Sequence, residues 1–366
     1  MPANNRIFYA SQALNLRGQN TDGTSFGTWY SPKGVQSVGM TTNFNIDQVF
    51  QLGQIELYDQ VEAVPEIEVT LNKVLDGTIP LYLLCMCGAT APSTASGKEM
   101  VNLANNRVNV RLGIFNDTLS TATGAPSFYV DASGMYLSRF TYTIPVDGNA
   151  TEDITLVGNN KFWGSGAIGL GVPGTASANF GFPNTAMTSP STIRRYSFNY
   201  AGSSLPTGVG GIRIPSGRSN ARPYVQSVTV SSDLGREAIY EIGRMAPYYR
   251  YVRFPVEVTS EFQVIASDGD YIDASDFSNV TGCGASYKNL SDQQITIQVC
   301  GSGGSDTLTL DLGNKNKLTS VNYTGGDTGG GNASLTYSFR TFNKFVMTGA
   351  GSFINTSLLG IVTTTW

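Results

Sequence analysis

The chain has 366 residues, of which 40% are hydrophobic and 14% are charged, and its formal net charge is −4. This length allows two domains of ordinary size, each able to bury a core of its own. The low charge fraction excludes a coiled coil and a charge-rich disordered chain. The acidic balance excludes a protein that holds nucleic acid through an overall basic surface. Frequent β-branched, aromatic and turn-forming residues favour an all-β fold.

Apolar and polar residues alternate along several stretches with the period of two that is typical of half-exposed strands. Ile67, Val69 and Leu71 alternate with polar residues, and the same period recurs in residues 256–264. Further strands are predicted at residues 107–115, 137–144, 154–157, 295–299, 307–312 and 335–340. Residues 78–88 suit a short helix or a buried strand. Residues 233–243 have apolar residues near helical spacing, although Gly235 opposes a helix. The predicted fold is all-β, mainly antiparallel, with short helices.

One stretch of the sequence occurs twice. Moved by 190 positions, Val35–Pro65 aligns without a gap on Val225–Pro255, and both copies begin with Val-Gln-Ser-Val. Gly53, Tyr58 and Pro65 also meet identical residues, which makes seven identities in 31 positions. The strands that follow the two copies alternate one residue out of phase, so a bulge or a one-residue shift must separate them.

A second repeated stretch extends the similarity over most of the chain. Residues 149–162 align on residues 332–345, and Phe8 falls on Phe198. Self-similarity at about half the chain length predicts a tandem duplication. We expect one domain at residues 1–185 and a second at residues 190–366. Residues 164–191 are rich in Gly, Pro and Ser and are expected to form the connection.

The sequence offers little for catalysis or metal binding. It contains no histidine, which excludes Ser-His-Asp and Cys-His arrangements, and it has no phosphate-binding or dinucleotide-binding glycine motif. The acidic stretch with Asp268, Asp270, Asp273 and Asp276 is a weak calcium candidate, and a solvated loop is favoured. The N-terminus shows no export signal, so Cys85, Cys87, Cys283 and Cys300 are expected to be reduced. We expect no catalytic residue, no metal, no cofactor and no enzymatic activity.

The two halves differ in charge. Residues 1–183 carry 9 basic and 14 acidic residues, a net of −5, whereas residues 184–366 carry 14 and 13, a net of +1. Acidic residues near the first repeat have apolar or aromatic counterparts in the second, and arginines of the second have uncharged counterparts in the first. Drift on solvated surfaces would explain this contrast equally well. A ring in which unlike halves alternate would be stabilised by it.

Several phrases resemble the tail tube proteins of long-tailed bacteriophages. They are Phe50–Gly53 with Pro65–Gly77, Leu234–Glu237 with Pro255–Thr259, and Gly134–Ile144 followed by Asp147–Thr155. The resemblance implies a β-sandwich domain whose inner sheet joins those of its neighbours into a barrel around a lumen. Some family members fuse two such domains, and three chains then form one ring with approximate sixfold symmetry. The duplication found here fits that variant.

The resemblance also implies roles for particular residues. Glu66, Glu68, Glu257 and Glu261 are expected to line the lumen, where an acidic surface would let DNA slide. Seven residues are expected at contacts between domains: Glu56, Asp59, Glu62, Arg236, Arg244, Arg250 and Arg253. The expected partners are other copies of the chain in homotrimeric rings, other tail proteins and double-stranded DNA in transit, with no membrane.

The implied location is the virion tail, reached after assembly in the host cytoplasm. Two alternatives stay open. One is a different β-rich virion protein, such as a capsid, decoration or neck protein. The other is a carbohydrate-binding fibre or adhesin module.

Overall fold

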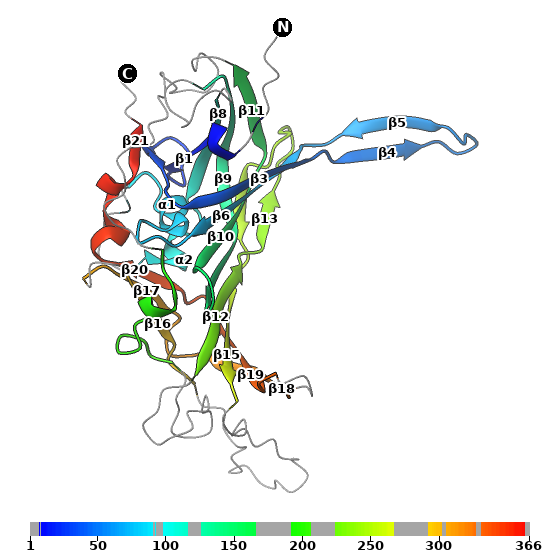
Figure 1. The fold of residues 1–366 in the computed structure, drawn as a ribbon. Helices are drawn as coiled ribbons and strands as arrows, with labels where there is room; N and C mark the ends of the chain where they lie inside the picture. Colours follow the sequence, from blue (N-terminus) through cyan, green and yellow to red (C-terminus); the bar gives the residue numbers. More distant parts are fainter. Residues whose placement is uncertain are drawn as a thin grey trace, which may run out of the picture.

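The computed structural model describes residues 7, 9–90, 92, 98–115, 126–165, 192–205, 224–266, 292–301, 305–326 and 331–362. Most of the expected connection at 164–191 lies outside these residues, and so does the acidic stretch around Asp268. Figure 1 shows the chain as an extended β-structure from which one hairpin projects. We refer to the parts before and after residue 185 as the first and second halves.

The first half contains most of the helical residues. Its strands are β1 (Gln12–Gln19), β2 (Phe26–Ser31), β3 (Val35–Asn43), β4 (Ile46–Phe50), β5 (Leu57–Glu62), β6 (Glu66–Val74), β7 (Lys98–Glu99), β8 (Arg107–Ile114), β9 (Phe128–Pro145), β10 (Thr151–Gly158) and β11 (Asn160–Ser165). Its helices are η1 (Tyr9–Ser11), α1 (Leu81–Met86) and α2 (Met100–Leu103). The stretch 78–88, for which helix and strand were both open, therefore contains a helix.

The second half is built from strands and short 3-10 turns. Its strands are β12 (Val225–Asp233), β13 (Arg236–Ile239), β14 (Tyr249–Val252), β15 (Glu257–Ile265), β16 (Thr296–Cys300), β17 (Thr307–Asp311), β18 (Lys317–Thr324), β19 (Ser334–Phe342), β20 (Val346–Gly349) and β21 (Gly360–Val362). The 3-10 turns are η2 (Arg195–Ser197), η4 (Gly351–Ile354) and η5 (Thr356–Leu358). All strand pairs within the described ranges are antiparallel. The all-β prediction with short helices is confirmed.

The helical spacing at residues 233–243 was misleading. This stretch forms β13, which pairs with β14 as a hairpin. Gly235 has a φ of 51°, a left-handed conformation that interrupts any helix through it. Leu234 is buried and its backbone N–H donates to the Ser138 carbonyl, so tertiary contacts override the local spacing.

One continuous sheet runs through both halves. Its strand order is β3-β6-β10-β9-β12-β15-β19-β18. The first half contributes the first four strands and the second half the last four. The joint between them is the pairing of β12 with the C-terminal part of β9, from Ser227↔Pro145 to Asp233↔Arg139. We call this pairing the internal joint.

The two halves pair their strands in the same order. In the main sheet β3-β6-β10-β9 corresponds to β12-β15-β19-β18. Outside the main sheet, a second strand order passes through the N-terminal part of β9 and reads β11-β9-β8-β1. It corresponds to β20-β17-β16 in the second half, where Phe198 and Ser204 bridge to β16 in the place of a fourth strand. Residues at equivalent positions in the two strand orders are called counterparts.

Local irregularities also coincide. The β3–β6 ladder shifts register between Val35 and Ser37, and the β12–β15 ladder shifts between Val225 and Ser227. The bulged residues are Gln36 and Gln226, and each side chain donates at 3.2 Å to the carbonyl two residues earlier. The expected one-residue shift is present too: β6 begins 31 residues after Val35, and β15 begins 32 residues after Val225.

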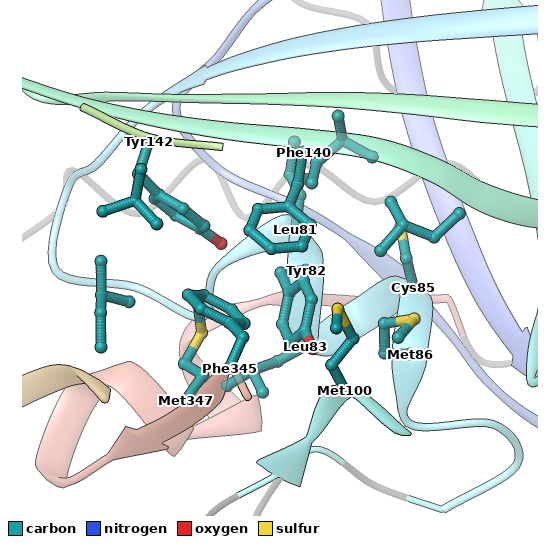
Figure 2. Close-up of a cluster of buried hydrophobic side chains, with 14 of the residues drawn as sticks. Leu81, Tyr82, Leu83, Cys85, Met86, Met100, Phe140, Tyr142, Phe345 and Met347 are labelled. Atoms are coloured by element: carbon teal, nitrogen blue, oxygen red, sulfur yellow. The ribbon is translucent and has the colours of Figure 1, made fainter. Parts of the chain in front are cut away.

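The core of the protein is shared by the two halves. Figure 2 shows Phe345 of the second half among Tyr82, Phe140 and Tyr142 of the first. The Phe345 ring centroid lies 4.6 Å from that of Phe140 and 5.2 Å from that of Tyr82. All four rings are buried. Burial of such a ring stabilises the fold by roughly 1.5–3 kcal/mol, so this cluster holds the halves together.

Helix α1 begins at this cluster without an ordinary capping residue. Pro80 precedes it and supplies no side-chain cap. The buried carboxylate of Glu152 accepts hydrogen bonds from the backbone N–H groups of Leu81 at 2.7 Å and Tyr82 at 2.8 Å. Tyr142 donates its hydroxyl to the same carboxylate. A negative charge at the first turn of a helix satisfies its free N–H groups and interacts favourably with its dipole.

Candidate functional site

One face of the main sheet is covered by the core, and the other is not. In the inner strands most core-facing residues are buried, whereas several in the end strands β3 and β18 are half-buried or exposed. The residues that alternate with them are at least partly exposed, apart from the pair Val157 and Tyr136 where β10 meets β9. We call the uncovered side the open face. It is rich in Ser, Thr and Asn, as in Ser37, Thr41, Thr70, Thr141, Thr143, Thr155, Thr229, Ser231, Thr259, Thr336, Ser338 and Asn322.

Charged residues on the open face are mainly acidic. Six are acidic (Glu66, Glu68, Asp153, Asp233, Glu257 and Glu261) and three are basic (Arg139, Lys317 and Arg340), a net of −3. The four glutamates expected to line a lumen are therefore brought together on this one face. Glu68, Glu257 and Glu261 are exposed, whereas Glu66 is half-buried by an ion pair with Arg250 at 3.0 Å.

Hydrogen bonds between strands hold polar side chains of the open face in place. Across the internal joint, Arg139 donates to Asp233 at 2.8 Å. This bond raises the pKa of Arg139. Partial burial opposes ionisation of Asp233, but the bonds from Arg139 and the Gly235 N–H outweigh it and lower the pKa of that carboxyl. Elsewhere Asn72 donates to Asp153 at 2.6 Å. A surface of hydrogen-bonded polar side chains with a net negative charge repels phosphate and offers it no cluster of cationic donors.

The two ends of the main sheet are edges. Within the part of the chain that the structure describes, β3 pairs only with β6, and β18 pairs only with β19. β3 corresponds to β12, and β18 corresponds to the C-terminal part of β9. The strands at the two edges are therefore the counterparts of the two strands that meet at the internal joint.

Core-facing residues are buried at the internal joint, whereas their counterparts at the two edges are half-buried or exposed. Val228 and Val230 of β12 are 1% and 0% exposed, and their counterparts Val38 and Met40 are half-buried. Tyr142 of β9 is 1% exposed, whereas its counterpart Tyr323 is 59% exposed. An unpaired apolar strand edge is a template for another strand.

A groove beside β3 marks the same difference. Val35, Gln36 and Val38 line a groove of about 380 Å³. At the internal joint, the counterparts Val225, Gln226 and Val228 line a space of only about 70 Å³, which Ile144, Pro145 and Val146 also line. The end of β9 occupies the position that is open beside β3.

Two of the arginines expected at domain contacts lie between the halves. Arg236 donates to the carbonyls of Leu137 at 2.7 Å and Ala104 at 2.5 Å, and burial lowers its pKa to about 10. Arg250 is 5% exposed and bonds both Glu66 and Asn159. Through them the β13–β14 hairpin is attached to the first half.

The other residues expected at contacts lie on the hairpins and do not meet one another. Arg244 pairs with Glu241 at 3.6 Å and Arg253 with Glu237 at 3.7 Å, both within the β13–β14 hairpin and largely exposed. Glu56, Asp59 and Glu62 are exposed on the β4–β5 hairpin. Within the described residues no ion pair joins these three carboxylates to an arginine of the second half.

The sequence reasoning missed Arg139, Asp233 and Lys317 of the open face, and it missed the two strand edges. The alternation of Ser and Thr in residues 227–233 was a usable signal for the face. Which strands form edges depends on pairing between residues far apart in the chain, for which no local signal exists.

No protein-family model matches the chain, and no curated protein is significantly similar to it in sequence. Among the described residues, no group of His, Cys, Asp and Glu side chains is arranged to hold a metal ion. No helix in the described ranges has the length and apolarity needed to cross a membrane.

Proposed function

We propose that this chain is a structural protein of two tandem domains that assembles head to tail into rings, and that stacked rings form a viral tail tube through which DNA passes. The observation that carries the proposal is the internal joint together with the two edges. β12 pairs with β9 inside the chain, and among the described strands their counterparts β3 and β18 are left without that partner. The β18 edge of one chain therefore matches the β3 edge of another.

Repetition of the internal joint between chains would join the main sheets into one. Each such contact is heterologous, and a closed ring of them leaves no free strand edge. Three chains, each with eight strands in the main sheet, would give a barrel of about 24 strands. With strands about 4.8 Å apart and tilted by roughly 40°, its backbone diameter is roughly 50 Å. Barrels with fewer strands already enclose a water-filled channel.

The open face supports a role as the wall of that channel. If the barrel closes with the core on its outer side, the open face lines the lumen. Its Ser, Thr and Asn side chains and its net charge of −3 then face the channel. DNA carries about one negative charge per 1.7 Å of its axis, so a basic wall would retain it. A polar, weakly acidic wall would let it slide without specific binding.

The test is to block the edge of β18 while leaving the chain folded. Val146 donates its N–H to Gln226 across the internal joint, and strand alternation places the N–H of Tyr142 on the same side. Tyr323 is the counterpart of Tyr142. Proline at an edge position removes only an outward N–H, so Tyr323→Pro is expected to fold as a monomer and to form no rings. Tyr323→Phe keeps the N–H and the ring and is the matched control.

The measurement is negative-stain imaging and light scattering, with circular dichroism to confirm folding. Native chain and Tyr323→Phe should give rings or tubes with a central hole. Discrete native monomers at every concentration and salt condition would reject the proposal, and so would unimpaired rings from folded Tyr323→Pro.

A further inference from the structure

The β4–β5 hairpin is the most exposed element of the described chain. Every residue of β4 and β5 is exposed, including Ile46, Phe50 and Leu57. Figure 1 shows this hairpin projecting away from the body of the protein, whereas the β13–β14 hairpin lies along the first half. The two hairpins are counterparts, and the glycines at their tips, Gly53 and Gly243, have the same φ of 90°.

One face of the docked hairpin supplies most of its contacts with the first half. Arg236, Ala238, Arg250 and Val252 share that face, and Arg250 and Val252 are 5% and 8% exposed. We call this face the contact face. Tyr249 lies on the other face by strand register, but it also touches the first half: it packs on Tyr136 with ring centroids 5.7 Å apart and donates its hydroxyl to the Asn105 carbonyl at 3.3 Å. Glu237 and Tyr251 lie on that other face and are exposed.

We propose that the β4–β5 hairpin docks on the second half of an adjoining copy of this chain, in the position that the β13–β14 hairpin takes on the first half. This inference rests on the proposed ring. By strand register, Ile46, Gln48, Gln60 and Glu62 are the counterparts of the contact face. The first-half residues that hold the docked hairpin have counterparts in the second half. Glu257 is the counterpart of Glu66, Phe342 of Asn159, and Lys317 of Tyr136.

The transferred contacts are chemically matched. Asp59 replaces Tyr249 and Lys317 replaces Tyr136, so the aromatic pair of one contact becomes an acid–base pair in the other. Gln60 replaces Arg250 opposite Glu257, so an ion pair becomes an amide hydrogen bond to a carboxylate. Lys317 already pairs with Asp292 at 2.8 Å, and Asp59 would give it a second carboxylate partner.

The two hairpins carry opposite net charges. Residues 44–65 contain four acidic residues and no basic one, a net of −4. The docked hairpin, residues 234–254, contains four arginines and two glutamates, a net of +2. Without the hairpins, each half has a net charge of −1 (−5 less −4 in the first, +1 less +2 in the second), so the charge contrast between the halves resides in the hairpins.

Thiol crosslinking tests the docking directly. In a chain with Cys283→Ser and Cys300→Ser, which keeps the buried Cys85 and Cys87, the pair Asp59→Cys and Lys317→Cys is treated with a short bis-maleimide. Because every chain carries both positions, crosslinks between neighbours connect all chains of a ring. The matched control is Asp47→Cys with Lys317→Cys, because Asp47 is the counterpart of Glu237, which is exposed and pairs with Arg253 of its own hairpin.

We expect covalent oligomers up to ring size from the Asp59 pair, in at least about tenfold excess over the Asp47 control, since adjacent thiols have a high effective concentration. Imaged rings with equal crosslinking from both pairs, or with more from Asp47, would overturn the hairpin docking and leave the ring intact. Absence of rings from the native chain would overturn both.

Discussion

Glu152 is the residue at which burial and ionisation are most closely linked to folding. Its counterpart in the second half is Leu335, so this carboxyl is a feature of the first half alone. Burial raises the pKa of Glu152 above its ordinary 4.5, against the opposing effects of Lys73 and of the hydrogen bonds from Tyr142 and α1. The folded chain therefore holds the proton to higher pH than the unfolded chain. Its contribution to stability is greatest below pH 4.5 and declines as pH rises through the folded pKa.

Replacement of Glu152 by Gln should remove this pH dependence. Gln keeps an acceptor for Tyr142 and Tyr82 but turns an N–H₂ group toward the Leu81 N–H. We expect a loss of about 1–3 kcal/mol at pH 4, and a smaller difference from the native chain as pH rises toward 7. Urea unfolding across this range measures it, with Glu68→Gln on the open face as control. A difference that stays constant or grows with pH would contradict the assignment.

At the scale of elements, the β13–β14 hairpin is held in place by Arg236. Its guanidinium donates to two backbone carbonyls of the first half and lies 5.1 Å over the Tyr136 ring. Neither carbonyl belongs to the hairpin itself. Loss of this side chain should therefore release the hairpin from the first half and leave the sheets intact.

We expect Arg236→Ala to cost about 2–4 kcal/mol, because a charged donor bonded to buried carbonyls is lost together with its packing. Hydrogen exchange should accelerate in β13 and β14 more than in β12 or β15. Arg253→Ala is the matched control: its ion pair with Glu237 is exposed, and its loss should cost less than about 1 kcal/mol. Equal effects of the two substitutions would contradict the anchoring role.

At the scale of the whole molecule, the charge of the open face should decide whether assembled protein retains DNA. Reversal of three exposed acids, Glu68→Lys with Glu257→Lys and Glu261→Lys, changes the net charge of that face from −3 to +3. We expect duplex DNA to bind the reversed protein with strong salt dependence, about 0.9 in logarithmic slope for each phosphate neutralised. The native protein should not bind at the same salt concentration.

The control for this experiment places the same three charge changes elsewhere. Asp147, Glu237 and Glu241 lie off the open face, and their reversal gives an equal net charge. Fluorescence anisotropy at several salt concentrations compares the three proteins. Equal DNA binding by the control and the open-face variant would show that overall charge, not the open face, is responsible.

The sequence by itself determined the local character of this protein. A period of two placed Ile67, Val69 and Leu71 in the core and Glu66 and Glu68 on the other side of β6, because successive side chains of a strand point to opposite faces. The repeated Val-Gln-Ser-Val marked the two strands β3 and β12, and the phase difference required the one-residue shift before β15. The spacing in residues 233–243 misled, because Gly235 and strand pairing outweigh a short apolar pattern.

Only the tertiary structure decided what those strands meet. Strands β3 and β12 share four of their nine residues but have different surroundings, since among the described strands β12 is paired on both sides and β3 on one. The counterparts Asp59 and Tyr249 differ in the same way, one exposed and the other packed between halves. The burial of Glu152 against α1 was also decided at this level. Strand partners are chosen by the burial that the whole chain achieves through contacts distant in sequence, and local sequence carries no record of them.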